Sequence, residues 1–264
     1  MTNDAVIDIQ GLDTRLGGAW IHRGLDLKVN RGEILGIVGG SGSGKTTLLR
    51  EILSLTPAAG GRINVLGTDI TTATPIELLK IQRRWGVLFQ QNALFSSLTV
   101  LENVEFPLRE HTKLDKQTMT QLAMLKILMA GLSVEAAQKM PSELSGGMQK
   151  RAGLARAIVM DPELIFLDEP TAGLDPNTAA GFDELILNLQ STMGLTIVMV
   201  THDLDSLWTI TNRVAFLGDK KVLACEPMKT LVKNPNPQIQ AFFSGPRGRA
   251  AAGSHLDGEA TDGN

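Results

Sequence analysis

One eight-residue segment constrains the fold of this chain more than any other. Residues 39–46 read Gly-Gly-Ser-Gly-Ser-Gly-Lys-Thr, a complete GxxxxGK[ST] pattern, and the preceding residues 33–38 are apolar enough to form a buried strand. The glycines let successive backbone N–H groups surround an anion, and a helix that begins near Lys45 points its positive end at the same place. The pattern therefore predicts a strand–loop–helix unit that binds the phosphates of a nucleotide.

The side chains of this phosphate loop have separate expected tasks. Lys45 is expected to reach the β- and γ-phosphates, and Thr46 to ligate Mg²⁺. The predicted nucleotide-binding set comprises the loop and the threonine after it: Gly39, Gly40, Ser41, Gly42, Ser43, Gly44, Lys45, Thr46 and Thr47.

Composition limits the other classes of function. With 264 residues, 43% of them hydrophobic, the chain is expected to be globular, with one large α/β domain or two smaller ones. A net charge of −3 with no long basic block argues against nucleic acid as a partner. The single cysteine, Cys225, has no partner for an internal disulfide, which suits a reducing cytosol.

The N-terminal residues do not predict export. Residues 1–8 lack the basic start and apolar core of a signal peptide, and the longest apolar runs are shorter than the roughly 20 residues that span a bilayer. We expect a cytoplasmic protein whose association with a membrane depends on a partner.

Short apolar runs that alternate with helical segments predict an α/β fold. Because the runs are apolar along their whole length, a mostly parallel sheet covered on both faces is expected, with nucleotide at the carboxyl ends of the strands. The expected strands are residues 6–9, 25–29, 34–38, 63–65, 87–88, 164–167, 197–200 and 214–217.

Between residues 94 and 155 the strand signal disappears. Helices are expected at residues 100–107, 117–131, 134–139 and 146–158, and this stretch is interpreted as a helical subdomain inserted into a core formed by residues 1–93 and 156–243. Leu122, Leu125, Leu128 and Leu132 recur near helical spacing, which favours core packing over a partner-binding surface. Residues 244–264 carry no apolar pattern and are expected to form a disordered tail.

Two carboxylates follow the predicted strand at residues 164–167. Asp168 is expected to hold Mg²⁺ through water, and Glu169 to polarise the water that attacks the γ-phosphate. The alternative is an acidic pair that only caps the next turn, and the phosphate loop upstream favours the catalytic interpretation.

A second anion site is predicted upstream of this pair. Ser145 is the expected N-cap of a helix whose first residues, Gly146, Gly147 and Met148, leave backbone N–H groups exposed. An ordinary capped helix is the alternative interpretation.

In this order, these motifs resemble those of the ATP-binding cassette (ABC) ATPases, which implies an ABC-type P-loop NTPase fold that uses ATP and Mg²⁺. The resemblance implies that Gln90 is the Q-loop glutamine, which contacts Mg²⁺ and the water. It further implies that Asp175 is the D-loop residue of a dimer interface and that His202 is the switch histidine at the γ-phosphate. The resemblance also implies a head-to-tail homodimer in which the Ser145 helix of one subunit closes on the γ-phosphate of the ATP held by the other.

The adenine contact departs from the family pattern. Leu16 occupies the position where an aromatic residue usually stacks on the base, and Trp20 is the proposed substitute, with a packed strand residue as the alternative. Ile239, Phe242 and Phe243 are expected to form one apolar helical face near the C-terminus. That face packs on its own domain or, as we hypothesise, reaches the neighbouring subunit.

Three segments around the Q-loop and signature, residues 88–95, 103–112 and 140–148, are similar to the ATPase of Mla-type phospholipid transporters. This resemblance implies an Mla-type permease as partner, with an MCE-type substrate-binding protein and a small STAS-type subunit, on the inner face of a bacterial inner membrane. An importer ATPase for amino acids or ions would share every ATP-contacting motif, so it remains an alternative. A non-transport ATPase would usually carry a coiled-coil insertion or a second cassette, and neither is visible.

Overall fold

The computed structural model describes residues 5–244, and the chain divides into two compact units. The first comprises residues 1–72 and 200–264, and the second comprises residues 73–199. The sequence analysis put the boundaries of an inserted subdomain at residues 94 and 155 instead, and that narrower division stays a prediction. The predicted tail lies outside the described residues from residue 245 onward.

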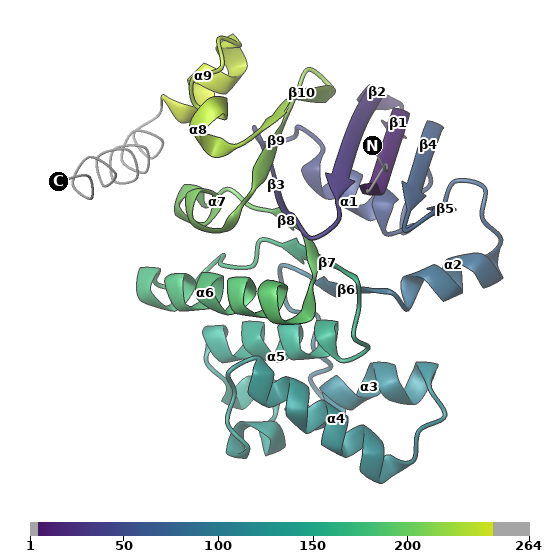
Figure 1. The fold of residues 1–264 in the computed structure, drawn as a ribbon, viewed down its shortest axis with the longest axis vertical. Helices are drawn as coiled ribbons and strands as arrows, with labels where there is room; N and C mark the ends of the chain where they lie inside the picture. The colour runs from purple at the N-terminus through teal and green to yellow at the C-terminus, as the bar shows by residue number, and fades with distance from the viewer. Residues whose placement is uncertain (1–4, 245–264) are drawn as a thin grey trace. The chain divides into compact units, whose positions relative to one another are not determined.

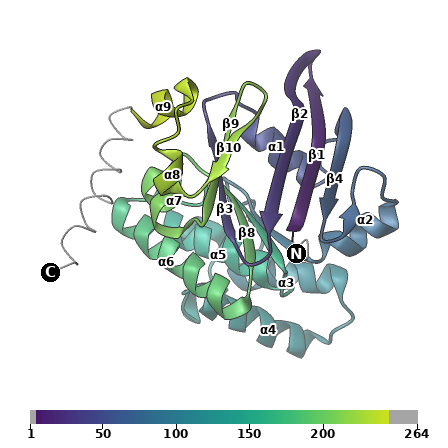
Figure 2. The ribbon, with the colours of Figure 1, turned by 45° about the horizontal axis from the view of Figure 1, so that its top comes forward.

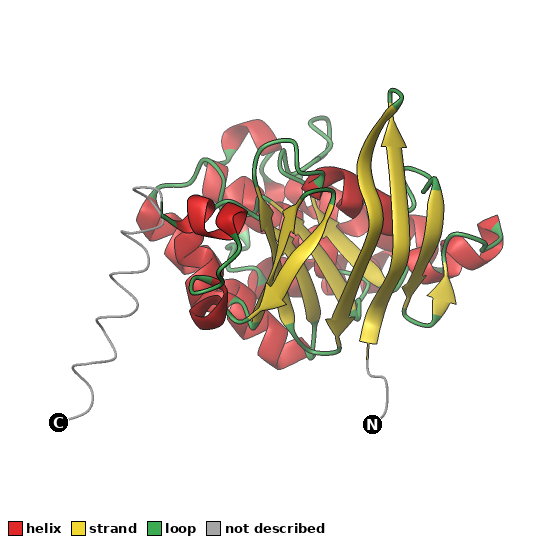
Figure 3. Ribbon diagram, turned by 90° about the horizontal axis from the view of Figure 1, so that it is seen from above, coloured by secondary structure: helices red, strands yellow, loops and turns green. Residues whose placement is uncertain are grey.

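The first unit contains an antiparallel sheet, visible as adjacent yellow arrows beside the N-terminus in Figure 3. Its strand order is β2 (Ala19–Asn30), β1 (Ala5–Leu16), β4 (Gly60–Val65) and β5 (Thr68–Asp69). Positive φ angles at Gly17 and Gly18 form the turn between β1 and β2, and these strands lie side by side in Figure 2. Because a tight turn joins only antiparallel strands, this sheet differs from the parallel pairing expected of the core.

The same unit holds the strand that leads to the phosphate loop. Strand β3 (Ile34–Gly39) is buried along its whole length and pairs in parallel with β9 (Arg213–Gly218), which in turn pairs with β10 (Lys221–Glu226). Helix α1 (Lys45–Ile52) follows the loop, and three shorter helices complete the unit: α7 (Leu204–Ile210), α8 (Met228–Leu231) and α9 (Pro237–Phe243).

Helix α9 packs within this unit. Ile239 is fully buried, and the ring of Phe242 lies edge-on to that of Phe216 at 5.3 Å between centroids. The hypothesis that this apolar face reaches a neighbouring subunit is therefore wrong for α9. Its apolar side chains cover β9 of their own domain.

The second unit contains three strands in the order β8 (Thr196–Val200), β7 (Leu164–Asp168) and β6 (Trp85–Leu88), with β6 and β7 parallel. In the sequence, helix α2 (Pro75–Gln82) precedes β6, and helix α6 (Pro176–Met193) lies between β7 and β8. Each of the eight expected strands is present in the structure, whereas β5 and β10 were not predicted.

The helices of the second unit form a hydrophobic core of their own. Figure 1 shows α3 (Val100–His111), α4 (Lys116–Met129) and α5 (Gly146–Ile158) together, and they share buried residues that include Val104, Ile127 and Ala155. The segment expected to be helical at 134–139 is a short 3-10 turn, η1 (Glu135–Gln138), and a second turn, η2 (Pro141–Glu143), precedes α5.

The leucine stripe of α4 is only partly buried. Leu125 and Leu128 are 50% and 47% exposed, so core packing is wrong for these two, because α4 turns this side away from α3 and α5. Leu122 and Leu132 do pack on the helical core. Across residues 5–244, no helix combines the length and apolarity that a bilayer crossing requires.

Candidate functional site

The phosphate loop depends on glycine at its two ends. Gly39 has φ 153°, and a Cβ there would collide with the Leu217 carbonyl of β9. Gly44 has φ 96°, and a Cβ there would collide with the ring of His22. At Gly40 and Gly42, in contrast, a Cβ would meet nothing within 4 Å, so the middle of the loop is open to an anion.

Lys45 lies over this open loop. Its Nζ donates hydrogen bonds to the carbonyls of Gly39 at 2.8 Å and Gly40 at 3.1 Å. Thr46 and Thr47 follow in the first turn of α1, which begins at Lys45 as predicted. An anion that approaches the loop therefore meets an ammonium group and the positive end of a helix together.

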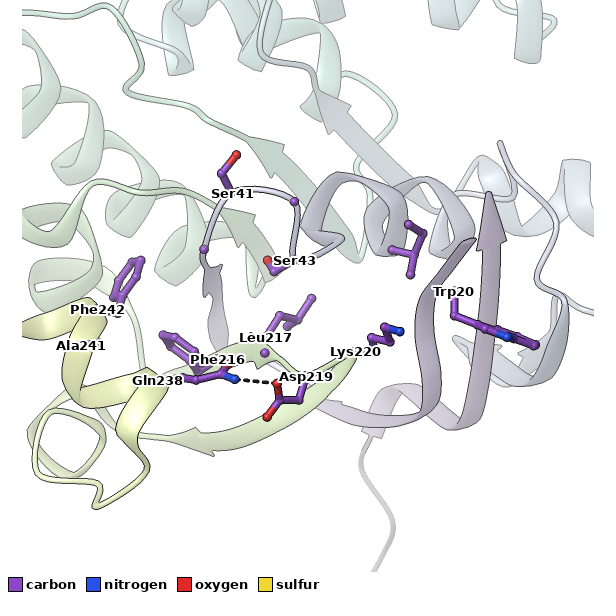
Figure 4. Close-up of a pocket in the computed structure, with 14 residues that line it drawn as sticks. Trp20, Ser41, Ser43, Phe216, Leu217, Asp219, Lys220, Gln238, Ala241 and Phe242 are labelled. Atoms are coloured by element: carbon purple, nitrogen blue, oxygen red, sulfur yellow. Dashed lines mark hydrogen bonds between the residues drawn. The ribbon is translucent and has the colours of Figure 1, made fainter. Parts of the chain in front are cut away.

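A cavity of about 620 Å³ adjoins the loop, lined by Gly40 to Ser43, the β9–β10 turn and α9 (Figure 4). Gln238 of α9 donates a 2.6 Å hydrogen bond to Asp219 in that turn. Trp20 lines the cavity, but Figure 4 shows its indole directed away from Ser41 and Ser43, and the guanidinium of Arg15 lies 5.4 Å from the ring centroid. Stacking of Trp20 on adenine stays a prediction.

A cluster of buried polar side chains lies beside the phosphate loop, where His22 is next to Gly44. The Thr14 hydroxyl contacts His22 Nδ1 at 2.8 Å and donates to Glu51 Oε2 at 2.7 Å, and all three residues are at most 2% exposed. The sequence analysis missed this cluster. In the structure His22 occupies a buried position of β2, and Glu51 lies beside Ile52 on the buried side of α1.

In the second unit, the acidic pair lies where the sequence predicted it. Asp168 is the last residue of β7 and is 9% exposed, and Glu169 follows in a left-handed conformation with φ 51°. Lys150 of α5 connects this point to the Q-loop, because its Nζ donates to the Glu169 carbonyl at 3.0 Å and to the Gln90 carbonyl at 2.8 Å. Sequence reasoning did not identify Lys150.

Ser145 is the N-cap of α5, as predicted. Its hydroxyl accepts a 3.3 Å hydrogen bond from the backbone N–H of Met148. Ser145 and Gly146 are exposed, and Gly147 packs so closely that a Cβ there would lie 2.7 Å from Thr178. The predicted signature segment therefore begins at the surface, with Ser145 and Gly146 exposed.

Asp175 is the N-cap of α6. Its carboxylate accepts hydrogen bonds from the Thr178 hydroxyl at 2.5 Å and from the Thr178 backbone N–H at 3.1 Å, and these bonds hold the pKa of Asp175 below its ordinary value. His202 follows β8 and is exposed, in the same unit as the phosphate loop. The roles of Asp175 at a dimer interface and of His202 at phosphate stay predictions.

The donor chemistry fits Mg²⁺. Thr46, Gln90 and Asp168 offer hydroxyl, amide and carboxylate oxygens, the ligand types that this hard cation prefers. Within residues 5–244, no group of three or more His, Cys, Asp or Glu side chains is placed to hold a metal by itself.

Comparison with known proteins gives consistent results. A family model described as ABC transporter matches residues 22–172. The phospholipid transport ATP-binding protein MlaF of Escherichia coli K12 is 40% identical over 91% of this chain and 89% of its own length. The probable ribonucleotide transport ATP-binding protein Mkl of Mycobacterium leprae is 36% identical over 94% and 71%. The methionine import protein MetN of Lacticaseibacillus paracasei is 38% identical over 92% and 70%.

Among solved structures, a dimeric ATP-binding cassette, MJ0796, in a post-hydrolysis state with ADP and Pi, matches with a TM-score of 0.77. It is 31% identical and covers 84% of this chain and 98% of its own. The fold is thus the P-loop α/β fold of such cassettes. This chain belongs to the ABC transporter family and is an ATPase that serves a transporter as its ATP-binding subunit.

Proposed function

We propose that this ATPase drives phospholipid transport between the inner and outer membranes of a bacterium, from the cytoplasmic face of the inner membrane. The observation that carries the proposal is the extent of the match to MlaF, which covers nine-tenths of both chains. The match to MetN leaves about a third of that relative uncovered, because 70% of its length aligns. An importer ATPase for a small solute is the second candidate, supported by the 38% identity to MetN.

The proposed chemistry assigns one task to each site residue. Lys45 and the loop N–H groups bind the phosphates, and Glu169 accepts a hydrogen bond from the attacking water and orients it. Gln90 and His202 complete the arrangement at the γ-phosphate. Thr46, Gln90 and, through water, Asp168 would hold Mg²⁺, which would supply positive charge to the phosphates.

Two cassettes would bind ATP between them. The exposed N–H groups after Ser145 would contact the γ-phosphate held by the partner subunit, so ATP joins the subunits and loss of phosphate separates them. Motion of this homodimer would then drive an Mla-type permease, with an MCE-type protein and a STAS-type subunit as further components.

A groove in the second unit supports a permease partner. Its volume is about 470 Å³, and it lies between the loop after β6 and helix α3, lined by Phe95, Phe106, Pro107, Glu110, His111 and Arg156. Phe95 is 43% exposed, although its ring contacts that of Phe106 at 4.7 Å between centroids. An aromatic pair of which Phe95 is exposed and Phe106 half-buried, with charged groups around it, suits a short amphipathic helix of a membrane protein.

Replacement of the carboxylate tests the catalytic assignment. Glu169→Gln keeps the shape but removes the charge that orients water, so we expect ATP binding to persist while turnover falls by about 10²-fold or more. Phosphate release and nucleotide binding measured on the same preparation separate the two effects. Turnover close to that of the unchanged chain would show that Glu169 is not the water-orienting group.

Purification of the intact complex from native membranes tests the substrate assignment. We expect the full chain to retain a multi-spanning permease, and lipid extraction followed by mass spectrometry to find phospholipid in excess over a mock purification. Recovery of an amino-acid or ion permease without bound phospholipid would establish the importer candidate instead. This experiment does not depend on the role of Glu169.

A further inference from the structure

Lys150 is a buried cation in the interior of the second unit. It lies on α5, five residues after Ser145, and is 3% exposed. Its Nζ donates two hydrogen bonds, to the Gln90 carbonyl at 2.8 Å and to the Glu169 carbonyl at 3.0 Å. A buried ammonium is unfavourable unless its N–H groups are satisfied, so these two carbonyls fix where the side chain lies.

Both carbonyls belong to residues assigned to the chemistry. Gln90 follows β6, and Glu169 follows β7, two neighbouring parallel strands. Glu169 has φ 51°, a conformation that a residue with a Cβ keeps only when its surroundings hold it in place. The hydrogen bond from Lys150 acts on the peptide group that carries this conformation.

Charge supports the same arrangement. Burial lowers the pKa of Lys150, while the nearby carboxylates of Asp168 and Glu169 act in the opposite direction and favour the charged form. The two carboxylates therefore attract the ammonium group electrostatically, in addition to its hydrogen bond to the Glu169 carbonyl.

The same helix holds the Q-loop at a second point. Arg156, six residues after Lys150 on α5, donates to the carbonyls of Asn92 at 2.8 Å and Ala93 at 2.6 Å. Two basic side chains of α5 thus hold the backbone that follows β6. Lys150 is the one that also reaches the residue after β7.

We propose that Lys150 is a positioning residue for ATP hydrolysis. From the helix that begins at the signature serine, it holds the backbone of Glu169 and Gln90 in one geometry, so that the Glu169 carboxylate and the Gln90 amide converge on the same water. This inference rests on the proposed role of Glu169. In this role Lys150 acts through the two carbonyls that it holds.

Lys126 provides a matched control for the test. It is also a buried lysine of the second unit, 6% exposed, and its Nζ pairs with Asp161 at 2.5 Å. Asp161 precedes β7, and the bond from Lys126 reaches neither Gln90 nor Glu169. Lys150→Met and Lys126→Met therefore both remove a buried ammonium, but only the first removes the bonds to the proposed catalytic segments.

We expect Lys150→Met to lower kcat for ATP by about tenfold or more, with KM and nucleotide Kd within about twofold, because positioning affects the reacting atoms and leaves the phosphate loop intact. Lys126→Met should keep kcat within about twofold. Lys150→Arg keeps the charge and two donors, so it should restore at least half of the lost rate on a logarithmic scale. Phosphate release by the full chain gives kcat and KM for each variant, and nucleotide binding to the same preparations gives Kd.

Each outcome decides for or against the inference. Equal kcat for Lys150→Met and Lys126→Met, or a parallel rise in KM and Kd, would overturn it. If Lys150→Met does not fold, Lys150→Gln replaces it, since the neutral amide can still donate to one carbonyl, and an unchanged kcat there would also overturn it. Glu169→Gln is assayed in parallel: an active Glu169→Gln contradicts the proposed function, whereas an inactive one beside a normal Lys150→Met contradicts only the role of Lys150.

Discussion

Cys225 is the single cysteine among the 264 residues, and the burial of its thiol predicts low reactivity. Burial raises the pKa of the Cys225 thiol, and this exceeds the opposite effect of Arg213, whose Nη1 lies 3.4 Å from Sγ. Because the thiolate is the nucleophile, alkylation by iodoacetamide should be slow at neutral pH and reach half its maximum rate at a higher pH than a free cysteine. Mass spectrometry of the folded chain, with the urea-denatured chain as control, measures this. Identical pH profiles for the two would contradict the assigned environment.

At the scale of elements, Asn103 connects α3 to the loop before it. Its side chain is fully buried, accepts a 2.7 Å hydrogen bond from Phe95 N–H, and donates to the carbonyls of Phe95, Leu98 and Thr99 at 2.9–3.1 Å. Asn103→Ala removes the bonds to the Phe95 N–H and the Leu98 carbonyl, whereas the Phe95 and Thr99 carbonyls keep backbone bonds from Leu98 and Asn103. We therefore expect a loss of about 2–3 kcal/mol in the free energy of unfolding. Chemical denaturation checks this, with Asn188→Ala on the exposed side of α6 as control. Equal stability of the two variants would show that the loop does not need Asn103.

Elements with a strong local pattern could be predicted from sequence. The bounds of α5 agree with prediction, because Ser145 marks its start, and β3 and β7 are continuous apolar runs. Strand β10 was missed because it is half-buried and begins and ends with charged residues, which weakens its apolar signal. Leu125 and Leu128 were misplaced because helical spacing identifies a stripe but not whether a neighbour covers it.

The candidate site shows the same contrast: contiguous motifs could be predicted from the sequence, whereas contacts between residues far apart in the chain could not. The phosphate loop and the acidic pair are contiguous motifs, so sequence located them. The contact between Lys150 and the Gln90 carbonyl joins residues 60 positions apart, and Thr14 and Glu51 are 37 apart. Such pairs arise only when the strands and helices pack, although a lysine at a buried position of a helix is a usable signal.

At the scale of the whole chain, the C-terminal helix α9 stabilises the unit that carries the phosphate loop. The Phe216 ring lies 5.3 Å from that of Phe242 and 6.4 Å from that of Phe243, and Ile239 is fully buried. Truncation after Asn234 uncovers this apolar surface, so the dilute monomer should lose about 2–4 kcal/mol of stability and melt at a lower temperature.

Truncation after Ser244 is the matched control for this experiment, because it keeps α9 and removes only residues 245–264. Thermal melting of the two truncated chains beside the full chain separates the helix from the residues that follow it. If α9 acts on its own domain, only truncation after Asn234 lowers the melting temperature, because only that truncation removes Phe242 and Phe243 from the Phe216 ring. If both truncated chains melt with the full chain while the chain that ends at Asn234 fails to assemble with a permease, the helix acts between subunits and its packing on β9 is not what stabilises the fold.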